Sequence, residues 1–409
     1  MQKSTLPNLR HLNLALTILA GSSLRTAARI CNMTQPAASL AISSLEDLLG
    51  VTLFERAPRG LMATQYARVL NERGIRAFSF LTQAMTLACG ESANDALISR
   101  KLIGLTTAQL QAMTALRNSH NFVAAAADLR MQPQSLKRTI LTLEGWLGFA
   151  IMASDETSIS MTEKGLQVGQ LMSQAVCEIR ALRTEIREMD SQIDGTVVIG
   201  SVRATASHLI PEAILRLNEQ YPFGKFSVIR ESYDVMMDAL EAAKLDYVCT
   251  TIRPKLSSGL TGEVLASSQL RVMCSANHPL ARKEIQLDDL LEFPWVGPPG
   301  VTGAAFAFRQ LFELHGMIPP AFAIETFATE WTQDLVMRSN YLLLCNTTQL
   351  NQDKPPFGMV YLKGITFGDP RPIWLIHRKD FKPTHFQSSF KKILKSVCNT
   401  LNAMTIIEL

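Results

Sequence analysis

The sequence predicts an α + α/β fold class, with a helical N-terminal half and an α/β C-terminal half. Three observations support this prediction. Residues 9–194 carry apolar side chains at helical spacing in nearly every segment. Within that half, a pattern of apolar and turn residues recurs after 98 residues. From Thr196 onward, short apolar runs alternate with amphipathic segments, as in a parallel sheet covered by helices.

The composition is that of a folded protein with several domains. Its 409 residues exceed what one hydrophobic core holds, and 47% of them are apolar. The net charge is only +4, but residues 1–90 hold nine Lys and Arg against four Asp and Glu. The seven cysteines are scattered without a C-x-x-C pair, which argues against a disulfide framework or a metal site. Because neither a signal peptide nor a membrane-spanning run is present, we expect a cytoplasmic protein with no membrane partner.

The first segments predict a winged helix-turn-helix after a helix at residues 9–20. The first short helix carries Ala27 and Ala28 on its apolar face. The next helix begins after the N-cap Thr34, has Pro36 in its first turn and ends at Gly50. The apolar stripe of this second helix is formed by Ala38, Ile42, Leu45 and Leu49. A strand-like run at 51–54 and a basic turn with Arg56 and Arg59 complete the module. An amphipathic hairpin with no role in DNA binding is the alternative.

This stretch resembles the N-terminal domain of LysR-type transcriptional regulators. The residues that carry the resemblance are Ser23, Ala27, Ala28, Gln35, Pro36, Ala37, Ser39, Ile42, Leu45, Glu46, Leu49, Gly50, Leu53, Phe54, Arg56, Arg59, Gly60 and Thr64. The resemblance implies a DNA-binding regulator. The chain departs from the family at Leu40, Ser43 and Ser44, where basic residues are frequent.

The 98-residue repeat predicts a second winged helix-turn-helix at residues 105–162. The matching pairs are Leu12/Leu110, Ala27/Ala125, Ala28/Ala126, Met33/Met131, Ile42/Ile140, Leu45/Leu143, Glu46/Glu144, Leu49/Leu147, Gly50/Gly148 and Thr64/Thr162. Family members normally carry one module, so this is a departure. The second copy has Lys137 and Arg138 on its recognition helix but an acidic wing at 154–156, which would repel phosphate. Chance similarity between helices is the alternative.

Two long helices are predicted, one after each module. The first, at residues 65–87, corresponds to the helix that pairs two subunits in the family, and residues 90–95 read as a linker. The second begins at Glu163 and carries a heptad seam formed by Val168, Met172, Ala175, Ile179, Leu182 and Ile186. We expect this seam to build a homodimer, or else to be buried against the protein's own next domain.

The second half predicts strands and helices in alternation. Strands are expected at 196–200, 226–229, 247–252, 270–274, 295–296, 323–325, 341–344 and 374–377, and helices at 210–221, 235–243 and 386–401. This half resembles the family's effector-binding domain at its start, at Asp246 and in the run at 277–281. The resemblance implies two α/β lobes like those of periplasmic binding proteins. We expect the later strands to form a second sheet.

These patterns divide the chain into five parts. They are a first winged helix-turn-helix at 1–64, a linker helix at 65–100, a second winged helix-turn-helix at 101–162, a dimerisation helix at 163–194, and an effector-binding domain at 195–409. In that domain, lobe I takes about 195–258 and 368–409, and lobe II about 259–367.

The predicted DNA contacts lie on the helix-turn-helix modules. They are Thr34, Gln35, Pro36 and Ser39 at the start of the first recognition helix, Arg56 and Arg59 on its wing, and Lys137 and Arg138 in the second module. Gln35 is suited to pair with adenine, and the arginines are suited to phosphate or a narrow minor groove. The alternative for each is an ordinary solvated position.

Effector-binding residues are expected after the strands, because ligands of α/β sheets bind beyond their carboxyl ends. The candidates are Ser201, Arg203, Thr205, Thr250 and Thr251 in the first lobe, and Thr329 and Asn346 in the second. Arg203 suggests an anionic effector, with an internal ion pair as the alternative.

The sequence therefore predicts a LysR-type regulator that binds double-stranded DNA and a small-molecule effector. A homodimer or homotetramer and contact with RNA polymerase are further expectations. No catalytic set, cofactor motif or metal spacing is found, so we do not expect an enzyme. The alternative function is a ligand-binding interaction protein whose helix-turn-helix modules serve oligomerisation.

Overall fold

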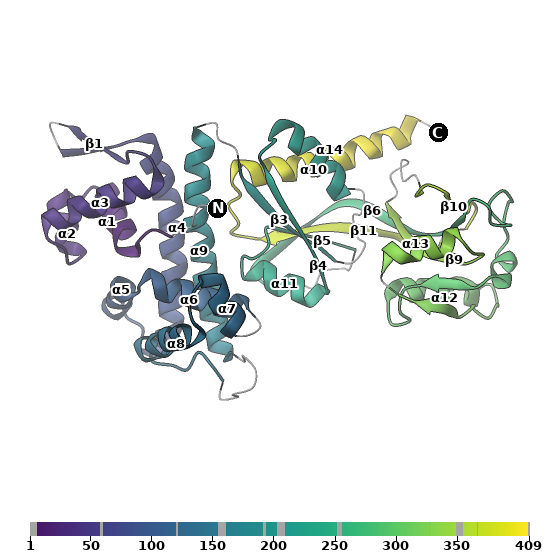
Figure 1. Ribbon diagram of the computed structural model, residues 1–409, viewed down its shortest axis with the longest axis horizontal. Coiled ribbons are helices and arrows are strands. Elements are labelled where there is room, and N and C mark those ends of the chain that lie inside the picture. Colours follow the sequence, from purple (N-terminus) through teal and green to yellow (C-terminus); the bar gives the residue numbers. More distant parts are fainter. Residues whose placement is uncertain are drawn as a thin grey trace. The chain divides into compact units, whose positions relative to one another are not determined.

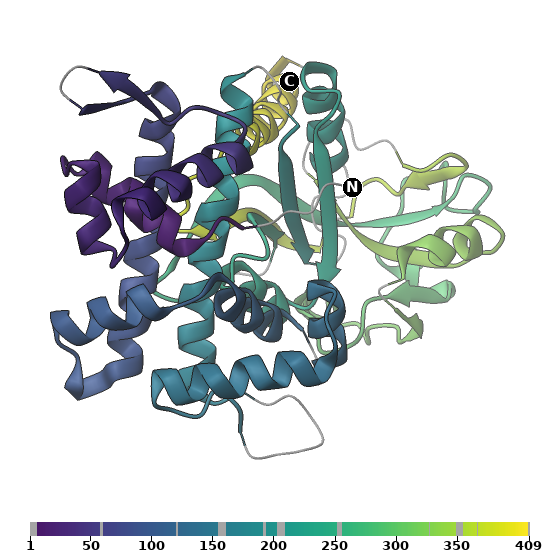
Figure 2. The ribbon, with the colours of Figure 1, turned by 60° about the vertical axis from the view of Figure 1, so that its left-hand side comes forward.

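The computed structural model describes the chain except residues 1–5, 58–59, 120–121, 154–160, 191–193, 203–208, 252–255, 327, 349–354, 366 and 408–409. It forms two compact units, Met1–Gly195 with Glu241–Lys244, and Thr196–Leu240 with Leu245–Leu409. The first unit is helical apart from a small hairpin, and the second contains a nine-stranded sheet (Figures 1 and 2). The predicted fold class is confirmed. Within the described part, no helix is long and apolar enough to cross a membrane.

The first module contains α1 (Leu9–Leu19), α2 (Leu24–Ile30), α3 (Gln35–Leu49) and the antiparallel wing strands β1 (Phe54–Ala57) and β2 (Gly60–Ala63). Side chains cap both short helices, since Ser23 accepts from the N–H of Thr26 and Thr34 from the N–H of Ala37. Gly50 ends α3 with φ +75°, a backbone conformation that residues with a Cβ rarely adopt. The first wing strand begins three residues later than the sequence suggested.

The second module contains α5 (Asp95–Gly104), α6 (Thr107–Asn118), α7 (Phe122–Leu129) and α8 (Pro133–Leu147). Helix α5 lies where we expected a linker and the start of the module, and Asn94 caps it by accepting from the N–H of Leu97. A bridge between Met152 and Met161 forms the base of its wing.

The two modules share backbone details as well as sequence. Asn32 and Arg130, 98 residues apart, both have positive φ, at 55° and 54°. Glu46 Oε1 accepts from the N–H groups of Leu53 and Phe54 at 2.6 and 3.1 Å. Glu144 Oε1 accepts from Ile151 and Met152 at 2.7 and 3.0 Å in the same way. Each glutamate therefore ties the end of its recognition helix to the segment that leads into the wing.

The long helices α4 (Gln65–Cys89) and α9 (Glu163–Met189) pack along each other, with the short turn η1 (Gly90–Ser92) after α4 (Figure 1). Tyr66, at the start of α4, donates to Asp190 Oδ1 at 2.7 Å, just beyond the end of α9. Lys164, at the start of α9, donates to the carbonyl of Ala88 at 2.9 Å. The two helices are therefore antiparallel.

The predicted dimerisation seam is buried within one chain. Val168, Met172, Ala175, Ile179, Leu182 and Ile186 each expose at most 4% of their surface. They belong to one core with α4 and both modules. The expectation that these residues pair with a second chain was therefore wrong. The seam is satisfied inside the chain, and its main partner is the earlier helix α4 rather than the next domain.

The second unit is built on one sheet with the strand order β4-β3-β5-β11-β6-β9-β7-β8, and β10 pairs with β6. Its strands are β3 (Thr196–Val202), β4 (Lys225–Glu231), β5 (Tyr247–Thr250), β6 (Leu260–Ser275), β7 (Trp295–Gly297), β8 (Phe322–Glu325), β9 (Leu342–Thr348), β10 (Met359–Tyr361) and β11 (Phe367–Arg378). The helices are α10 (Leu209–Gln220), α11 (Tyr233–Glu241), η2 (Asp288–Glu292), α12 (Gly303–Leu314), α13 (Thr329–Met337) and α14 (His385–Ile407).

Two lobes share this sheet instead of having a sheet each, which corrects our expectation. The long antiparallel strands β6 and β11 run through both lobes. Parallel strands β3, β4 and β5 extend the sheet on one side, and β7, β8 and β9 extend it on the other. The second lobe has its own aromatic core around Trp295, which is fully buried and donates to the carbonyl of Leu290 at 2.9 Å.

Candidate DNA-binding surface and effector-binding strands

The recognition helix of the first module presents a polar start to solvent. Ala38 and Ile42 on its inner face are buried, so Gln35 and Ser39 are left exposed. Thr34 caps the helix and Pro36 lies in its first turn, which fixes the direction of the exposed residues. Leu40 is 71% exposed beside them. A capped helix with free polar groups at its start is the arrangement that reads base edges in a major groove.

The wing of the first module lies next to this helix in the chain and is fixed to it by Glu46. Arg56 on β1 is exposed and lies opposite Leu61 on β2. Sequence reasoning missed that Leu61 and Met62 are also exposed, although two apolar residues beside a basic turn were a visible signal. Arg59 lies outside the described residues.

The recognition helix of the second module carries its basic pair at the equivalent place. Lys137 and Arg138 are exposed and lie 98 residues after Ser39 and Leu40. The start of this helix is weaker, because the N-cap residue Gln132 makes no side-chain capping bond. The acidic residues of its wing, Asp155 and Glu156, lie outside the described residues.

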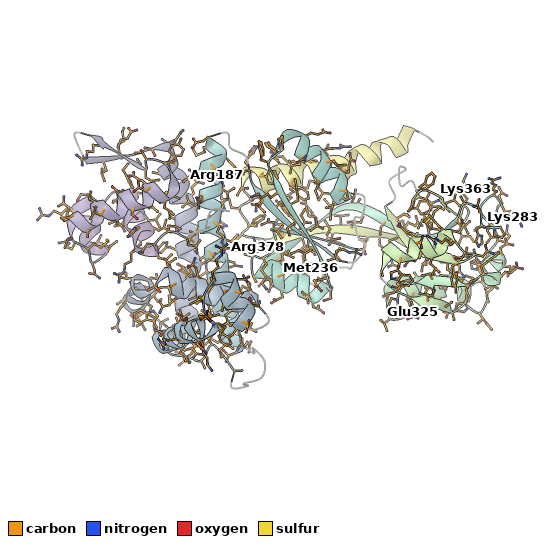
Figure 3. The ribbon with its side chains drawn as sticks, in the orientation of Figure 1. Arg187, Met236, Lys283, Glu325, Lys363 and Arg378 are labelled. Carbon is orange, nitrogen blue, oxygen red and sulfur yellow. The ribbon has the colours of Figure 1, made fainter. Side chains whose placement is uncertain are left out.

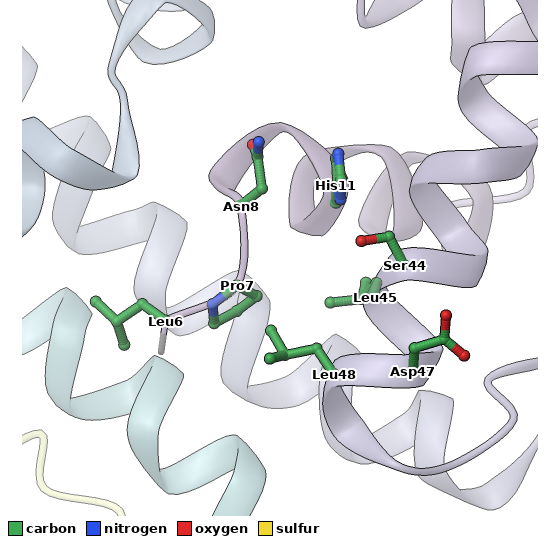
Figure 4. A pocket seen from close by; sticks show the side chains of 8 residues that line it. All are labelled: Leu6, Pro7, Asn8, His11, Ser44, Leu45, Asp47 and Leu48. Atoms are coloured by element: carbon green, nitrogen blue, oxygen red, sulfur yellow. The ribbon is translucent and has the colours of Figure 1, made fainter. Parts of the chain in front are cut away.

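A pocket in the first module marks a difference between the copies. It lies between the start of α1 and the second half of α3 (Figure 4), and its lining residues are Leu6, Pro7, Asn8, His11, Ser44, Leu45, Asp47 and Leu48. In the second module, Trp146 stands where Leu48 does and Gly104 where Leu6 does. The ring of Trp146 packs against Gly104 so closely that an added Cβ would lie 2.3 Å from it. The same place is thus filled by a side chain in one copy and open in the other.

Ser201 and Thr250 lie close together at the carboxyl edge of the first lobe. Thr250 is the last residue of β5, and Ser201 is the residue before the last in the parallel neighbour β3. Ser201 pairs with Cys249 in register, and both Ser201 and Thr250 are buried. Thr251 follows directly. Arg203 and Thr205 lie outside the described residues.

The two effector-binding candidates of the second lobe, Thr329 and Asn346, lie at different kinds of position. Thr329 begins α13, but Asn346 lies within β9, opposite Leu270 on β6, instead of following the strand. Sequence reasoning missed Glu325, labelled in Figure 3, which ends β8 and accepts from the N–H of Gly300 at 3.2 Å. Glu325 thereby ties the loop at 298–300 to the carboxyl edge of this lobe.

Asp246 holds strands of the first lobe together through its side chain and its backbone. Its Oδ2 accepts from the N–H of Val198 at 2.8 Å, and its own N–H donates to the carbonyl of Val198. Burial raises the pKa of Asp246 to about 6, and the N–H of Val198 and the guanidinium of Arg378 limit the rise. Arg378 (Figure 3) is itself buried and donates to the carbonyls of Leu240 and Leu245 at 2.7 and 2.6 Å. The role that the structure gives Asp246 is therefore to hold the strands that carry Ser201 and Thr250.

Sequence reasoning also missed a cluster of charges between α4 and α9. Arg73 is 1% exposed and donates to Glu178 Oε2 at 2.7 Å and to Glu185 at 2.5 and 3.0 Å. Arg76 donates to Glu178 Oε1 at 2.9 and 3.0 Å. Burial opposes the charge on Arg73, but the two carboxylates outweigh it and raise its pKa. The signal that sequence reasoning passed over was an arginine on the apolar stripe of α4.

Family comparisons agree with both halves of the chain. The model of the LysR substrate binding domain matches residues 190–399. The model of the bacterial regulatory helix-turn-helix protein of the lysR family matches twice, at 9–68 and 107–166. The two matches are 98 residues apart, as the repeat requires. The first half therefore contains two copies of the family's DNA-binding module.

Individual relatives show the same relationship. The HTH-type transcriptional regulator GalR of Pseudomonas putida is 23% identical over 91% of this chain and 93% of its own length. The uncharacterized HTH-type transcriptional regulator YdcI of Escherichia coli is 24% identical over 65% of this chain and 90% of its own.

A full-length OxyR variant from Pseudomonas aeruginosa shares the fold, with 17% identity and a TM-score of 0.50 over 72% of this chain and 94% of OxyR. The YdcI and OxyR alignments use nearly all of the relative and leave about a third of this chain unmatched. The chain belongs to the LysR family of bacterial transcriptional regulators, with two helix-turn-helix modules and one effector-binding domain.

Proposed function

We propose that the first module reads bases through Gln35 and Ser39, while Arg56 contacts phosphate. The supporting observation is the exposed polar start of α3, held by the Thr34 cap and joined to the wing through Glu46. Lys137 and Arg138 are exposed at the matching place in the second module and supply its contacts. Arg59 belongs to the same wing turn in the sequence, and we assign it a phosphate contact.

Fluorescence anisotropy on DNA from upstream of the protein's own gene tests these contacts. Arg56→Ala should weaken binding to all sequences alike and lower the slope of log K against log salt by about 1. Gln35→Ala should cost about 1–3 kcal/mol on the preferred sequence and relax specificity there. Arg180→Ala is the matched control, because Arg180 is exposed on α9 outside both modules. Normal binding by the Arg56 and Gln35 variants would favour the alternative, in which the modules serve oligomerisation.

For the second unit we propose a small anionic effector bound at the carboxyl edge of the strands. Ser201 and Thr250 lie together there, and Arg203 follows in the same loop of the sequence. A thermal-shift screen of carboxylates and phosphates tests this, with Arg203→Gln as the variant. Stabilisation that persists in Arg203→Gln would assign Arg203 to an internal ion pair. We further propose that the protein acts at promoters in the cytoplasm, in contact with RNA polymerase.

A further inference from the structure

We propose that the two modules form a pseudo-dimer within a single chain, which presents two different recognition helices to a DNA site with two unlike halves. The pairing of the modules follows from the α4–α9 contacts. The DNA consequence rests on the proposed DNA-binding function. The two parts are therefore tested separately.

The contacts between the modules follow an approximate two-fold axis. The Tyr66–Asp190 bond joins the start of α4 to the end of α9, and the Lys164–Ala88 bond joins the start of α9 to the end of α4. Lys164 is the residue that corresponds to Tyr66 in the repeat. The equivalent residues Tyr66 and Lys164 therefore each bond to the far end of the opposite long helix, as a two-fold relation requires.

Equivalent residues also meet each other directly. The N–H of Leu9 donates to Thr107 Oγ1 at 3.2 Å, and Thr107 is the position 98 residues after Leu9. In a two-fold pair, a residue contacts its own equivalent only on the axis. Within one chain, the modules are therefore related as two subunits of a symmetric dimer would be.

The charge cluster between α4 and α9 makes each of these helices complementary to the other helix and not to a second copy of itself. Arg73 faces Glu178 and Glu185 at one end of the pair. At the equivalent positions of the other end stand Leu171, Phe80 and Leu87, which pack against the apolar core. One end of the helix pair is therefore ionic and the other apolar.

Pairing of like helices would break this arrangement. Two α4 helices would place Arg73 against Phe80 and Leu87, and two α9 helices would place Glu178 and Glu185 against Leu171. Each leaves a buried charge without its counter-ion, which is strongly unfavourable. The unlike pair places Arg73 and Arg76 against Glu178 and Glu185, so the cluster acts as a specificity device against self-pairing.

The two recognition helices that result are chemically different. Helix α3 exposes Gln35, Ser39 and Leu40, whereas α8 exposes Lys137 and Arg138. Symmetric dimers bind palindromic sites because their two readers are identical. A chain with two unlike readers is suited to a site whose halves differ.

Isotope-mixed cross-linking of the full chain tests the pairing without DNA. Lys164→Cys places a thiol next to Ala88, beside the native half-buried Cys89. Chains labelled with ¹⁴N and ¹⁵N are unfolded together in urea, refolded, and linked with a short bis-maleimide. We expect every linked 89–164 peptide pair to carry a single isotope. Pairs of mixed isotope at about half of the total would show pairing between chains, and the absence of an 89–164 link would refute the helix pair itself.

The residues at the equivalent positions of the repeat supply matched variants that test whether the charge cluster selects the partner helix. Arg73→Leu leaves Glu178 and Glu185 with one cation fewer and should lower the unfolding temperature. The quadruple variant Arg73→Leu, Arg76→Gln, Glu178→Phe, Glu185→Leu copies the other end of the helix pair onto the ionic end and leaves no arginine without its carboxylate, so it should regain stability. It should also give mixed-isotope links in the Lys164→Cys background, because self-pairing is no longer penalised. Single-isotope links alone in this variant would show that the cluster does not select the partner.

Footprinting on DNA from upstream of the protein's own gene tests the two readers. Gln35→Ala with Ser39→Ala should remove protection from one segment, and Lys137→Ala with Arg138→Ala from another. Loss of protection at the same two symmetric segments in both variants would overturn the assignment of unlike halves. If the unmodified protein leaves no footprint, DNA binding itself fails, while the cross-linking result still decides the pairing.

Discussion

Asp246 shows how a single residue ties the first lobe together at an energetic cost. Its carboxylate accepts from Val198 at 2.8 Å, yet it is buried deeply enough for its pKa to rise from 3.8 to about 6. Well below pH 3.8 the group is protonated in both the folded and the unfolded chain. Above pH 6 it is ionised in both, and only the folded state bears the cost of a buried charge.

We therefore expect the free energy of unfolding to fall as pH rises through this window. The shift corresponds to about 3 kcal/mol between pH 3 and pH 8. Asp246→Asn still accepts the bond from Val198 and does not titrate, so its stability should lack this fall. Urea denaturation of both proteins at several pH values measures the difference between them. A difference that stays constant with pH would contradict the raised pKa.

At the scale of elements, the glutamates Glu46 and Glu144 hold each recognition helix to its wing. Each accepts two backbone N–H groups from the segment that follows its helix. A backbone donor that loses its partner away from water is costly, so these side chains fix the geometry in which helix and wing meet DNA.

Alanine at either position should destabilise the first unit by about 1–3 kcal/mol. Because the two sites are equivalent in the repeat, Glu46→Ala and Glu144→Ala should have similar effects in thermal unfolding. Asp47→Ala is the control, since Asp47 is an exposed neighbour of Glu46. Equal stability of all three variants would show that the hydrogen bonds contribute little. A large effect at one site alone would show that the modules are not equivalent.

At the scale of the whole molecule, the first unit depends on both long helices. The inner stripes of α4 and α9 are buried in a common core, including Leu70, Leu81, Met172 and Leu182. Removal of either helix would expose the stripe of the other, with the charges that it carries. The two modules are therefore one folding unit rather than two independent domains.

A chain that starts at residue 101 should consequently fail to form a stable monomer. It lacks α4, so the seam of α9 is exposed and Glu178 and Glu185 lose Arg73 and Arg76. We expect self-association and loss of helix content, measured by light scattering and circular dichroism. The full chain is the reference. A monodisperse, fully helical monomer from residue 101 would show that the second module folds without the first.

Much of the fold and part of the site follow from local sequence. The caps Ser23 and Thr34 and the positive φ of Gly50 are local requirements, so the helix-turn-helix was predictable from spacing alone. The repeat predicted the second copy in the same way, except for α5, which lies partly in the stretch that we expected to be a linker. At the first effector edge, the parallel strands β3 and β5 bring Ser201 and Thr250 together, as strand order requires.

The heptad pattern of α9 is enough to predict that one face of this helix is buried, but the partner that covers the face is known only from the three-dimensional fold. A heptad seam specifies an apolar surface, but the hydrophobic effect is non-directional and accepts any complementary surface. The partner is set by groups far apart in the chain, such as Arg73 and Glu178, whose pairing no local pattern reveals. For the same reason, a single sheet shared by two lobes could not be deduced, because the pairing of β6 with β11 joins segments about a hundred residues apart.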